Sequence, residues 1–151
     1  MTYVRPLRQS DLTREYFTLL NQLSNYPLPS SDFTFNNEAL YNFGIYQHNS
    51  NHYILVALHK DVIIGTAALL IEYKIRGLRC AHIEDVVVDS SYRGHGTGKQ
   101  LIEELVKIAK SCNCYKVILD CSDTNVKFYE ECGFRKYENC MRMNLNEGIV
   151  D

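Results

Sequence analysis

Two hydrophobic patterns alternate along the chain of 151 residues. Short apolar runs bounded by Gly, Asn, Asp or charged residues are typical of strands, whereas apolar residues spaced three and four apart are typical of helices. The runs predict strands over residues 2–8, 53–58, 62–73, 80–88 and 116–121, and a last strand within 134–145. The helical spacings predict a first helix with Asp11 as its N-cap, and further helices over residues 36–47, 99–110 and 125–132.

The order of these elements predicts the fold class. A strand and two helices come first, a meander of three strands follows, and the chain then alternates helix, strand, helix, strand. Residues 25–32 contain two prolines and predict a loop. The continuous apolar run KVILDC at 116–121 is typical of a strand buried on both faces. We therefore predict a single α/β (α+β) domain over residues 1–151, built on a mixed sheet.

Composition excludes several classes of protein. The chain carries 16 Lys and Arg against 18 Asp and Glu, so its net charge of −2 at pH 7 provides no global positive field for nucleic acid or an anionic membrane. With 46% hydrophobic residues it is an ordinary globular chain rather than a disordered one. It has no apolar run of membrane-spanning length and no signal-peptide core near its start, so we expect a cytoplasmic protein.

The cysteines are expected to be reduced thiols. They form no C-x-x-C pair, so small apolar packing residues are a better interpretation than a structural zinc site. The six are Cys80, Cys112, Cys114, Cys121, Cys132 and Cys140.

A glycine-rich segment, RGHGTGK at 93–99, lies between a predicted strand and a predicted helix. Glycines let the backbone turn sharply and approach a ligand, and the first amides of the helix have no internal partner. With the charges of Arg93 and Lys99, the segment predicts a phosphate cradle. A P-loop needs Gly in place of Arg93, and a dinucleotide fingerprint needs Gly in place of Lys99, so both are excluded. A glycine-rich turn without a ligand stays an alternative.

The remaining pattern, R-x-x-G-x-G, resembles the pyrophosphate loop of the GNAT N-acetyltransferases. Three segments, HIEDVVV at 82–88, CYKVILDC at 114–121 and NVKFYEECGF at 125–134, more specifically resemble the glucosamine-6-phosphate N-acetyltransferase family. The resemblance implies the GNAT fold, a mixed and mostly antiparallel sheet with a splayed central strand, flanked by about four helices. It also implies acetyl transfer from acetyl-coenzyme A to the amine of D-glucosamine 6-phosphate, giving N-acetyl-D-glucosamine 6-phosphate for UDP-N-acetylglucosamine biosynthesis.

The same resemblance implies a mechanism and partners. We expect direct attack in a ternary complex, since no cysteine stands in an evident nucleophile–base arrangement. The family resemblance implies a homodimer whose last strand contributes to the partner's site, and it implies no metal, nucleic acid or membrane. Two alternatives are an acetyltransferase for another small amine or a protein N-terminus, and a non-catalytic protein that binds acetyl-coenzyme A.

The expected catalytic residues are Tyr129, Glu84, Asp85 and Val86. Tyr129 matches the family's tyrosine that protonates the departing thiolate, and an ordinary phenol pKa of about 10 keeps it protonated at neutral pH. Val86 lies where the family's central strand splays, so its N–H is expected to bond the thioester oxygen. Glu84 and Asp85 line the amine pocket by resemblance, on opposite faces of their strand by alternation. A carboxylate there can orient the ammonium and accept its proton.

Further contacts also follow from the resemblance. The expected acetyl-coenzyme A contacts are Val86, Val87, Val88, Arg93, Gly94, His95, Gly96, Thr97, Gly98, Lys99, Asn125 and Tyr129. The expected sugar-phosphate contacts are Ser24, Lys74, Arg76, Glu84, Asp85, Lys116, Asp120 and Arg142. The sequence departs from the family pattern in a shorter hairpin at 74–79 and at Asn144, which stands where the family has a late arginine that Arg142 is a candidate to replace. His82 is expected to anchor its strand rather than to act as a base.

Overall fold

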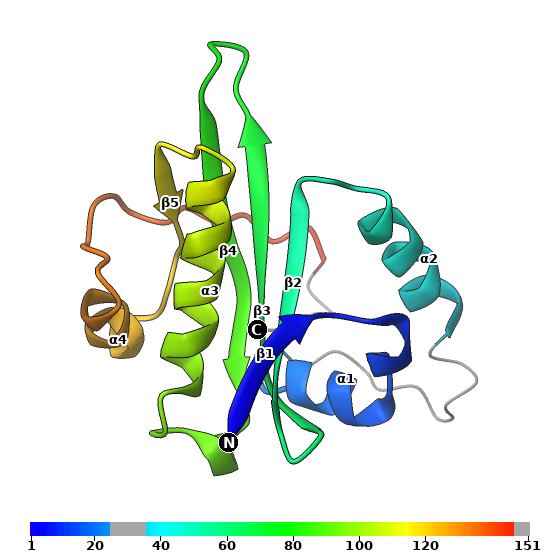
Figure 1. Ribbon diagram of the computed structural model, residues 1–151. Coiled ribbons are helices and arrows are strands. Elements are labelled where there is room, and N and C mark those ends of the chain that lie inside the picture. The colour runs from blue at the N-terminus through cyan, green and yellow to red at the C-terminus, as the bar shows by residue number, and fades with distance from the viewer. Residues whose placement is uncertain (25–35, 147–151) are drawn as a thin grey trace.

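A computed structural model describes residues 1–24 and 36–146 of the chain (Figure 1). The loop predicted over residues 25–32 lies outside the described residues. Within the described part, every helix is too short or too polar to span a bilayer.

A five-stranded sheet forms the centre of the fold (Figure 1). The pairs formed among the first four strands are all antiparallel. The fifth strand runs parallel to the fourth. In chain order, which is also their order in the sheet, they are β1 (Thr2–Pro6), β2 (His52–His59), β3 (Val62–Tyr73), β4 (Arg79–Val88) and β5 (Lys116–Ile118). The expected mixed, mostly antiparallel sheet is confirmed.

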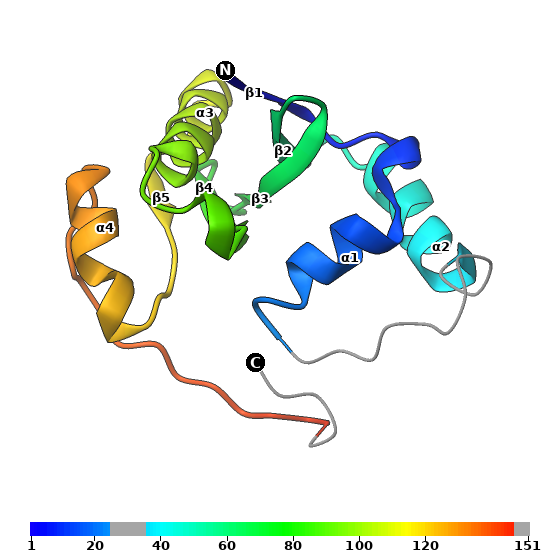
Figure 2. The same cartoon turned by 90° about the horizontal axis from the view of Figure 1, so that it is seen from below.

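Helices lie on both sides of the sheet (Figure 2). One side carries α1 (Arg14–Leu20) and α2 (Asn36–Gln47), and the other carries α3 (Thr97–Ser111) and α4 (Val126–Glu131). Single 3₁₀ turns cover Gln9–Asp11, Ser90–Tyr92 and Asp123–Asn125. This layout gives the sheet a cover on each face, as an α/β domain requires.

Two hydrophobic cores follow from the alternation of side chains along the strands. Since successive residues of a strand point to opposite faces, one sheet can serve a core on each side. The larger core joins the sheet to α3, and its largest fully buried side chains are Ile64, Leu69, Ile71, Leu101, Ile102 and Leu105. The smaller core lies beneath α1 and α2 and contains Leu7, Tyr16, Phe43, Val56 and Leu58.

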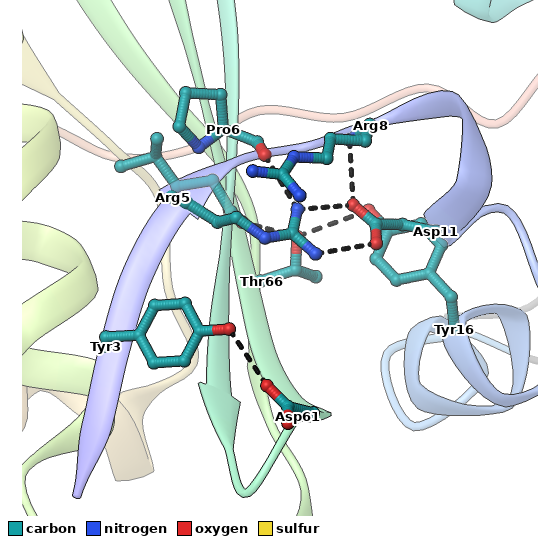
Figure 3. A network of polar contacts seen from close by, with 9 residues as sticks. Tyr3, Arg5, Pro6, Arg8, Asp11, Tyr16, Asp61 and Thr66 are labelled. Atoms are coloured by element: carbon teal, nitrogen blue, oxygen red, sulfur yellow. Dashed lines mark hydrogen bonds and ion pairs between the residues drawn. The ribbon is translucent and has the colours of Figure 1, made fainter.

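A polar network joins β1 to the 3₁₀ turn before α1, and joins α1 to β3 (Figure 3). The Arg5 guanidinium donates two hydrogen bonds to the Asp11 carboxylate, at 2.7 and 2.8 Å, and the Arg8 backbone N–H donates a third at 2.7 Å. The Thr66 hydroxyl donates to a backbone carbonyl of β2 at 2.8 Å, so its contact with the Tyr16 hydroxyl at 3.2 Å must be one that it accepts. These bonds set the position of α1 over β3.

The prediction that Asp11 is the N-cap of the first helix is wrong. The Thr13 hydroxyl accepts a hydrogen bond from the Tyr16 backbone N–H at 3.4 Å and is the N-cap of α1. Asp11 is 8% exposed, and its carboxylate forms an ion pair with the Arg5 guanidinium. The ion pair with Arg5 engages the Asp11 carboxylate, so the Thr13 hydroxyl caps the helix instead.

The structure also corrects the last two predicted strands. β5 ends at Ile118 instead of residue 121, and its side chains are exposed or half-buried rather than buried on both faces. Residues 134–146 form no strand within the described part of the chain. Both differences have one reason, since a strand persists only where a neighbouring strand takes up its backbone hydrogen bonds and covers its apolar side chains.

Candidate active site

The pairing of β3 and β4 is interrupted at one place. Ala68 faces Glu84 and Thr66 faces Val87, so β4 has one residue more than β3 between these pairs. This is a β-bulge, and Asp85 within it has a left-handed φ of 53°. Such a conformation in a non-glycine residue is uncommon and is held there by the surrounding strands.

The bulge changes which side chains share a face of β4. Ile83 belongs to the core beneath α3, and Val86 and Val88 pack against the same core. Regular alternation would place residues 83, 85 and 87 together, so the extra residue shifts the phase by one. The expectation that Glu84 and Asp85 lie on opposite faces of a regular strand therefore does not hold here.

Among the described residues, β4 has an open edge beyond His82. Its pairing with β5 covers three residue pairs and ends at His82 opposite Ile118, whereas β4 itself continues to Val88. Figure 1 shows the two strands separating toward the start of α3. This divergence confirms the expected splayed central strand. An open edge of this kind presents backbone N–H and C=O groups that an extended ligand can pair with.

The glycine loop ends at the N-terminus of α3. Gly94 and Gly96 have φ angles of 81° and 83°, in the region that favours glycine. Gly96 is the N-cap without a side chain to offer, and the first helical hydrogen bond runs from the Gln100 N–H to the Gly96 carbonyl at 3.0 Å. The amides of residues 97–99 come before that ladder, so they are available to an anion at this helix end.

Gly98 has a different reason to be glycine. A Cβ built there would lie 3.1 Å from Cζ of Phe128 and 3.6 Å from Cγ2 of Val88. The start of α3 can therefore lie close to α4 and β4 only without a side chain at this position.

A glutamine after α1 joins the loop to the first helix. The Gln22 amide donates to the Asp89 carboxylate at 3.1 Å, and its oxygen accepts from the Ser90 backbone N–H at 3.1 Å. Arg93 reaches the same oxygen at 3.5 Å and donates to the Val88 carbonyl at 3.0 Å. The loop is thus braced by Gln22, just after α1, and by the end of β4.

Tyr129 lies in α4 and is 9% exposed. Its ring packs edge-on to Phe128 and Phe134, with centroids 4.9 and 6.1 Å away. Burial raises the pKa of Tyr129 to about 12, and the nearby Cys121, Cys132 and Asp120 add to the effect. Within residues 1–24 and 36–146, its hydroxyl has no hydrogen-bond partner.

Acidic groups gather where β4 and β5 separate. Partial burial raises the pKa of Glu84, and the carboxylates of Asp120 and Asp85 raise it further. Asp120 follows the end of β5, and all three side chains are exposed. The structure therefore brings the three acidic candidates within electrostatic range of one another.

Basic groups lie at the other end of the same strands. Lys74 follows β3, and its Nζ contacts the Glu72 carboxylate at 3.1 Å. Lys116 is paired with Cys80 across β4 and β5, so it shares a sheet face with that residue. Both ammonium groups act on the Cys80 thiol, whose pKa is nevertheless raised, chiefly by burial. Arg76 is exposed in the turn between β3 and β4.

The other predicted site residues have the following places. Ser24 is half-buried after α1. Asn125 is at the N-cap position of α4, but its side chain makes no capping bond. His95 is exposed, with Nδ1 3.3 Å from the Tyr92 carbonyl. The Arg142 Nε donates to Asn144 at 2.6 Å on the exposed segment after α4.

Comparison with known proteins decides the family. The model of the acetyltransferase (GNAT) family matches residues 13–134. This chain belongs to the GNAT acetyltransferase family. A Trypanosoma brucei brucei relative named glucosamine 6-phosphate N-acetyltransferase is 42% identical over 94% of this chain and 95% of its own. A Schizosaccharomyces pombe relative of the same name is 47% identical over 68% of this chain and 96% of its own.

Solved structures agree with this GNAT assignment. The crystal structure of glucosamine-6-phosphate N-acetyltransferase from Arabidopsis thaliana has a TM-score of 0.85 and 35% identity, covering 97% of this chain and 99% of that one. An acetyltransferase structure from Trypanosoma brucei has a TM-score of 0.82 and 40% identity, covering 96% of this chain and all of the other. The expected GNAT fold is confirmed.

GNAT enzymes use acetyl-coenzyme A, and this acetyltransferase has groups suited to it. The amides at the start of α3 suit a pyrophosphate, and the open edge of β4 suits the amide-bearing pantetheine arm. The bulge places irregular backbone between these regions and the acidic groups.

Sequence reasoning missed one residue of this GNAT site, Gln22, and the packing reason for one glycine, Gly98. Gln22 contacts residues 67–71 positions away, and no local pattern marks such a contact. Phe128 explains why Gly98 lacks a side chain, a constraint that becomes visible only once α3 and α4 are packed.

Proposed function

We propose that this chain transfers an acetyl group from acetyl-coenzyme A to the amine of D-glucosamine 6-phosphate, giving N-acetyl-D-glucosamine 6-phosphate. The observation that carries the proposal is 42% identity, over 94% of the chain, with a relative named for that activity. We place the reaction in the cytoplasm, as a step of UDP-N-acetylglucosamine biosynthesis.

The cofactor would lie along β4 and the loop that follows it. The pyrophosphate would accept hydrogen bonds from the amides of residues 97–99, with Arg93 and Lys99 supplying positive charge. The pantetheine amides would pair with the backbone of β4 from Val86 to Val88, the edge that β5 leaves open. This arrangement would bring the thioester to the bulge.

Acetyl transfer would then proceed by direct attack. The neutral sugar amine forms the new C–N bond with the thioester carbon, and the Val86 N–H stabilises the charge that develops on the carbonyl oxygen. Glu84, with Asp85 and Asp120, orients the ammonium and accepts its proton directly or through water. The C–S bond breaks as the intermediate collapses, and coenzyme A leaves as its thiolate. The proton that the attacking nitrogen must still lose to become an amide passes to water.

Tyr129 is the proposed donor to the leaving sulfur. Its hydroxyl is protonated at neutral pH because burial raises the pKa to about 12. It lies in α4, on the same side of the sheet as α3 and the loop (Figure 2). A hydrogen bond from this phenol would strengthen as negative charge accumulates on sulfur.

The sugar phosphate would be held by the basic groups at the other end of β4. Lys74 and Lys116 act together near Cys80, and Arg76 lies in the adjacent turn. Ser24 and Arg142 complete the proposed set, Arg142 in place of the family's late arginine. Glu84 and these lysines lie at different points along β4 and its neighbours. This separation suits a substrate whose amine and phosphate are at different positions.

We further propose a homodimer in which the segment after α4 adds to the partner's site. Residues 135–146 are exposed in the single chain. Tyr137, Met141, Met143 and Leu145 stand at odd positions between polar residues, which is the alternation of a strand with one buried face. A second copy of this chain would supply the missing neighbour.

Thiol release with three sugars tests the function. We expect release with glucosamine 6-phosphate, and a kcat/KM for glucosamine at least about a hundredfold lower, because charge-assisted bonds contribute about 1.5–3 kcal/mol each. Glucose 6-phosphate carries the phosphate without the amine and should release no thiol.

The same assay separates the alternatives. Equal kcat/KM values for the two amino sugars would favour an acetyltransferase for another amine. No release with any amine, in a protein that binds acetyl-coenzyme A by calorimetry, would favour the non-catalytic alternative.

A further inference from the structure

Three side chains with metal-binding atoms converge on one face of the β3–β4 hairpin. Cys80 and His82 are two apart on β4, so they share a face of the strand. Glu72 is directly opposite Cys80 in the register. The Cys sulfur, a His ring nitrogen and a carboxylate oxygen all lie within 4.8 Å of one another.

This face is not part of the core beneath α3. The neighbours of the trio along the strands, Ile71 and Ala81, belong to that core, so the trio points to the opposite side of the sheet. Cys80 is 1% exposed and is held by the packing around it, whereas His82 is half-buried and Glu72 is exposed. The arrangement therefore has a fixed sulfur at its base and an opening on the side of the carboxylate.

The chemistry of the three donors suits a borderline-soft cation. Thiolate, imidazole and carboxylate are all zinc ligands, with bond lengths of about 2.0–2.3 Å. Two such ligands on a tetrahedral ion are about 3.3 Å apart by that geometry. The His82 Nε2 and Glu72 Oε2 atoms are now 2.9 Å apart, so a small separation admits an ion between them.

The charge of the three ligands also suits a divalent ion. Once Cys80 gives its proton to solvent, the thiolate and the Glu72 carboxylate together balance two positive charges. Lys74 contacts Glu72 through the other carboxylate oxygen, Oε1, at 3.1 Å, so it can stay in place and orient that ligand.

We propose that Glu72, Cys80 and His82 bind one zinc ion per chain. Three protein ligands leave a fourth position for water, as in zinc sites that remain open. The thiolate and imidazole favour Zn²⁺ over Mg²⁺ and Ca²⁺, which prefer oxygen ligands.

Zinc at this place would affect the sugar side of the active site. His82 stands two residues before Glu84 on the same strand, and Lys116 faces Cys80 from β5. The ion would therefore occupy the surface proposed for glucosamine 6-phosphate, and we expect the two to compete. This second expectation rests on the proposed function, whereas zinc binding itself does not.

A titration of the purified full chain with zinc, against a chromophoric chelator, tests the site without any substrate. We expect one ion per chain. Glu72→Gln, Cys80→Ser and His82→Asn should each weaken binding by at least the about 10–100-fold that loss of an outer-shell partner costs. The Cys112→Ser/Cys114→Ser double variant is the matched control for thiols elsewhere and should bind like the unchanged protein.

Cobalt substitution supplies a spectroscopic readout. Co²⁺ in this site should give a thiolate-to-metal charge-transfer band that Cys80→Ser abolishes and the double variant retains. If Cys80→Ser folds poorly, Glu72→Gln still tests the site, because Glu72 is exposed and its substitution should not disturb the fold. Full-strength zinc binding in Glu72→Gln and His82→Asn, or loss of binding in the double variant, would overturn the site.

Competition is measured separately, by repeating the zinc titration with glucosamine 6-phosphate present. A weaker apparent zinc affinity in the presence of the sugar phosphate supports the shared surface. Unchanged zinc affinity, together with normal acetyl transfer, would overturn only the placement of the zinc on the sugar side.

Discussion

The phenol of Tyr129 combines burial with a hydroxyl that is free of hydrogen bonds within the described residues. Its pKa of about 12, raised by burial, means that it donates a hydrogen bond to a thiolate more readily than it gives up the proton. We therefore expect Tyr129→Phe to lower kcat by about a hundredfold, the usual cost of losing one hydrogen-bond donor to a developing negative charge. Both KM values should change little, because the interaction forms as charge develops.

Steady-state kinetics with both substrates, at a pH where chemistry limits the rate, measure this effect. Tyr41→Phe is the matched control, since that ring is 69% exposed on α2. A near-normal kcat in Tyr129→Phe would make Tyr129 a packing residue only.

The carboxylate of Glu84 should set an acidic limb in the pH profile. Its pKa is raised by partial burial and then by Asp120, so its ionised form accumulates at higher pH than for an ordinary Glu. Removing the Asp120 charge stabilises ionised Glu84 and lowers its pKa. We expect the acidic limb of kcat/KM in Asp120→Asn to move to lower pH, whatever the loss in absolute activity.

Profiles of kcat/KM between pH 5 and 8 for the unchanged protein, Asp120→Asn and Asp123→Asn check this. Asp123 lies three residues further along and does not act on Glu84, so its variant should keep the original limb. A limb that stays in place in Asp120→Asn would assign it to another group.

At the scale of elements, Gln22 links α1 to the glycine loop. Gln22→Ala removes one bond to Asp89 and one to Ser90, each contributing about 0.5–1.5 kcal/mol to the ordered loop. We expect acetyl-coenzyme A to bind about 3–10-fold more weakly, since the loop must then be ordered on binding. Calorimetry should show no change for Gln47→Ala, an exposed residue at the end of α2. Unchanged affinity in Gln22→Ala would mean that the loop is rigid without this brace.

The pair of Arg5 and Asp11 joins β1 to the 3₁₀ turn Gln9–Asp11 that precedes α1. Burial opposes ionisation of Asp11, but the hydrogen bonds from the Arg5 guanidinium and the Arg8 backbone, with the charges of both arginines, together outweigh it, and the pKa of Asp11 is lowered. A lowered pKa contributes stability above the unfolded value, about 3.9, and this contribution is lost as the pH falls through the folded value. We expect Asp11→Asn to reduce the free energy of unfolding by about 1.5–3 kcal/mol at pH 7.

Urea unfolding at pH 7 and at pH 3 measures the difference, which should shrink at the lower pH. Asp61→Asn is the control, because Asp61 is exposed in a turn and surface changes stay within about 0.5 kcal/mol. An equal loss at both pH values would show that the Asp11 charge is not responsible.

Sequence patterns predict some elements better than others, and the reason is physical. Apolar runs predict β3 and β4 to within a residue, because these central strands are covered on both sides by this chain's own helices. The motif segments likewise place Tyr129, Glu84 and the glycine loop. Contacts between distant elements decide the bulge at Asp85, the bonds of Gln22 and the cap at Thr13. The spacing of apolar residues along the chain does not show which distant elements will meet.

At the scale of the whole molecule, the C-terminal segment is the main conflict between pattern and fold. Its alternation predicts a strand within 134–145, yet residues 135–146 are exposed and form no strand within the described part of the chain. β5 is similarly short, with Ile118 exposed. The strand pattern and the lack of a neighbouring strand among residues 1–24 and 36–146 are both explained if the neighbour belongs to a second copy.

A matched pair of substitutions tests the proposed homodimer. Met143 is 83% exposed in the single chain, so Met143→Asp should leave the monomer's stability almost unchanged. If a partner covers this face, the variant forfeits about 1.5–3 kcal/mol of apolar burial per chain and buries a charge as well. We expect the dimer to dissociate at protein concentrations at least tenfold higher than for the unchanged protein, as measured by sedimentation velocity.

Asn144→Asp adds the same charge to the next residue, on the other face of the segment, and should leave the dimer intact. An unchanged chain that sediments as a monomer at all concentrations would rule the homodimer out, and equal weakening by both substitutions would place the contact outside the apolar face.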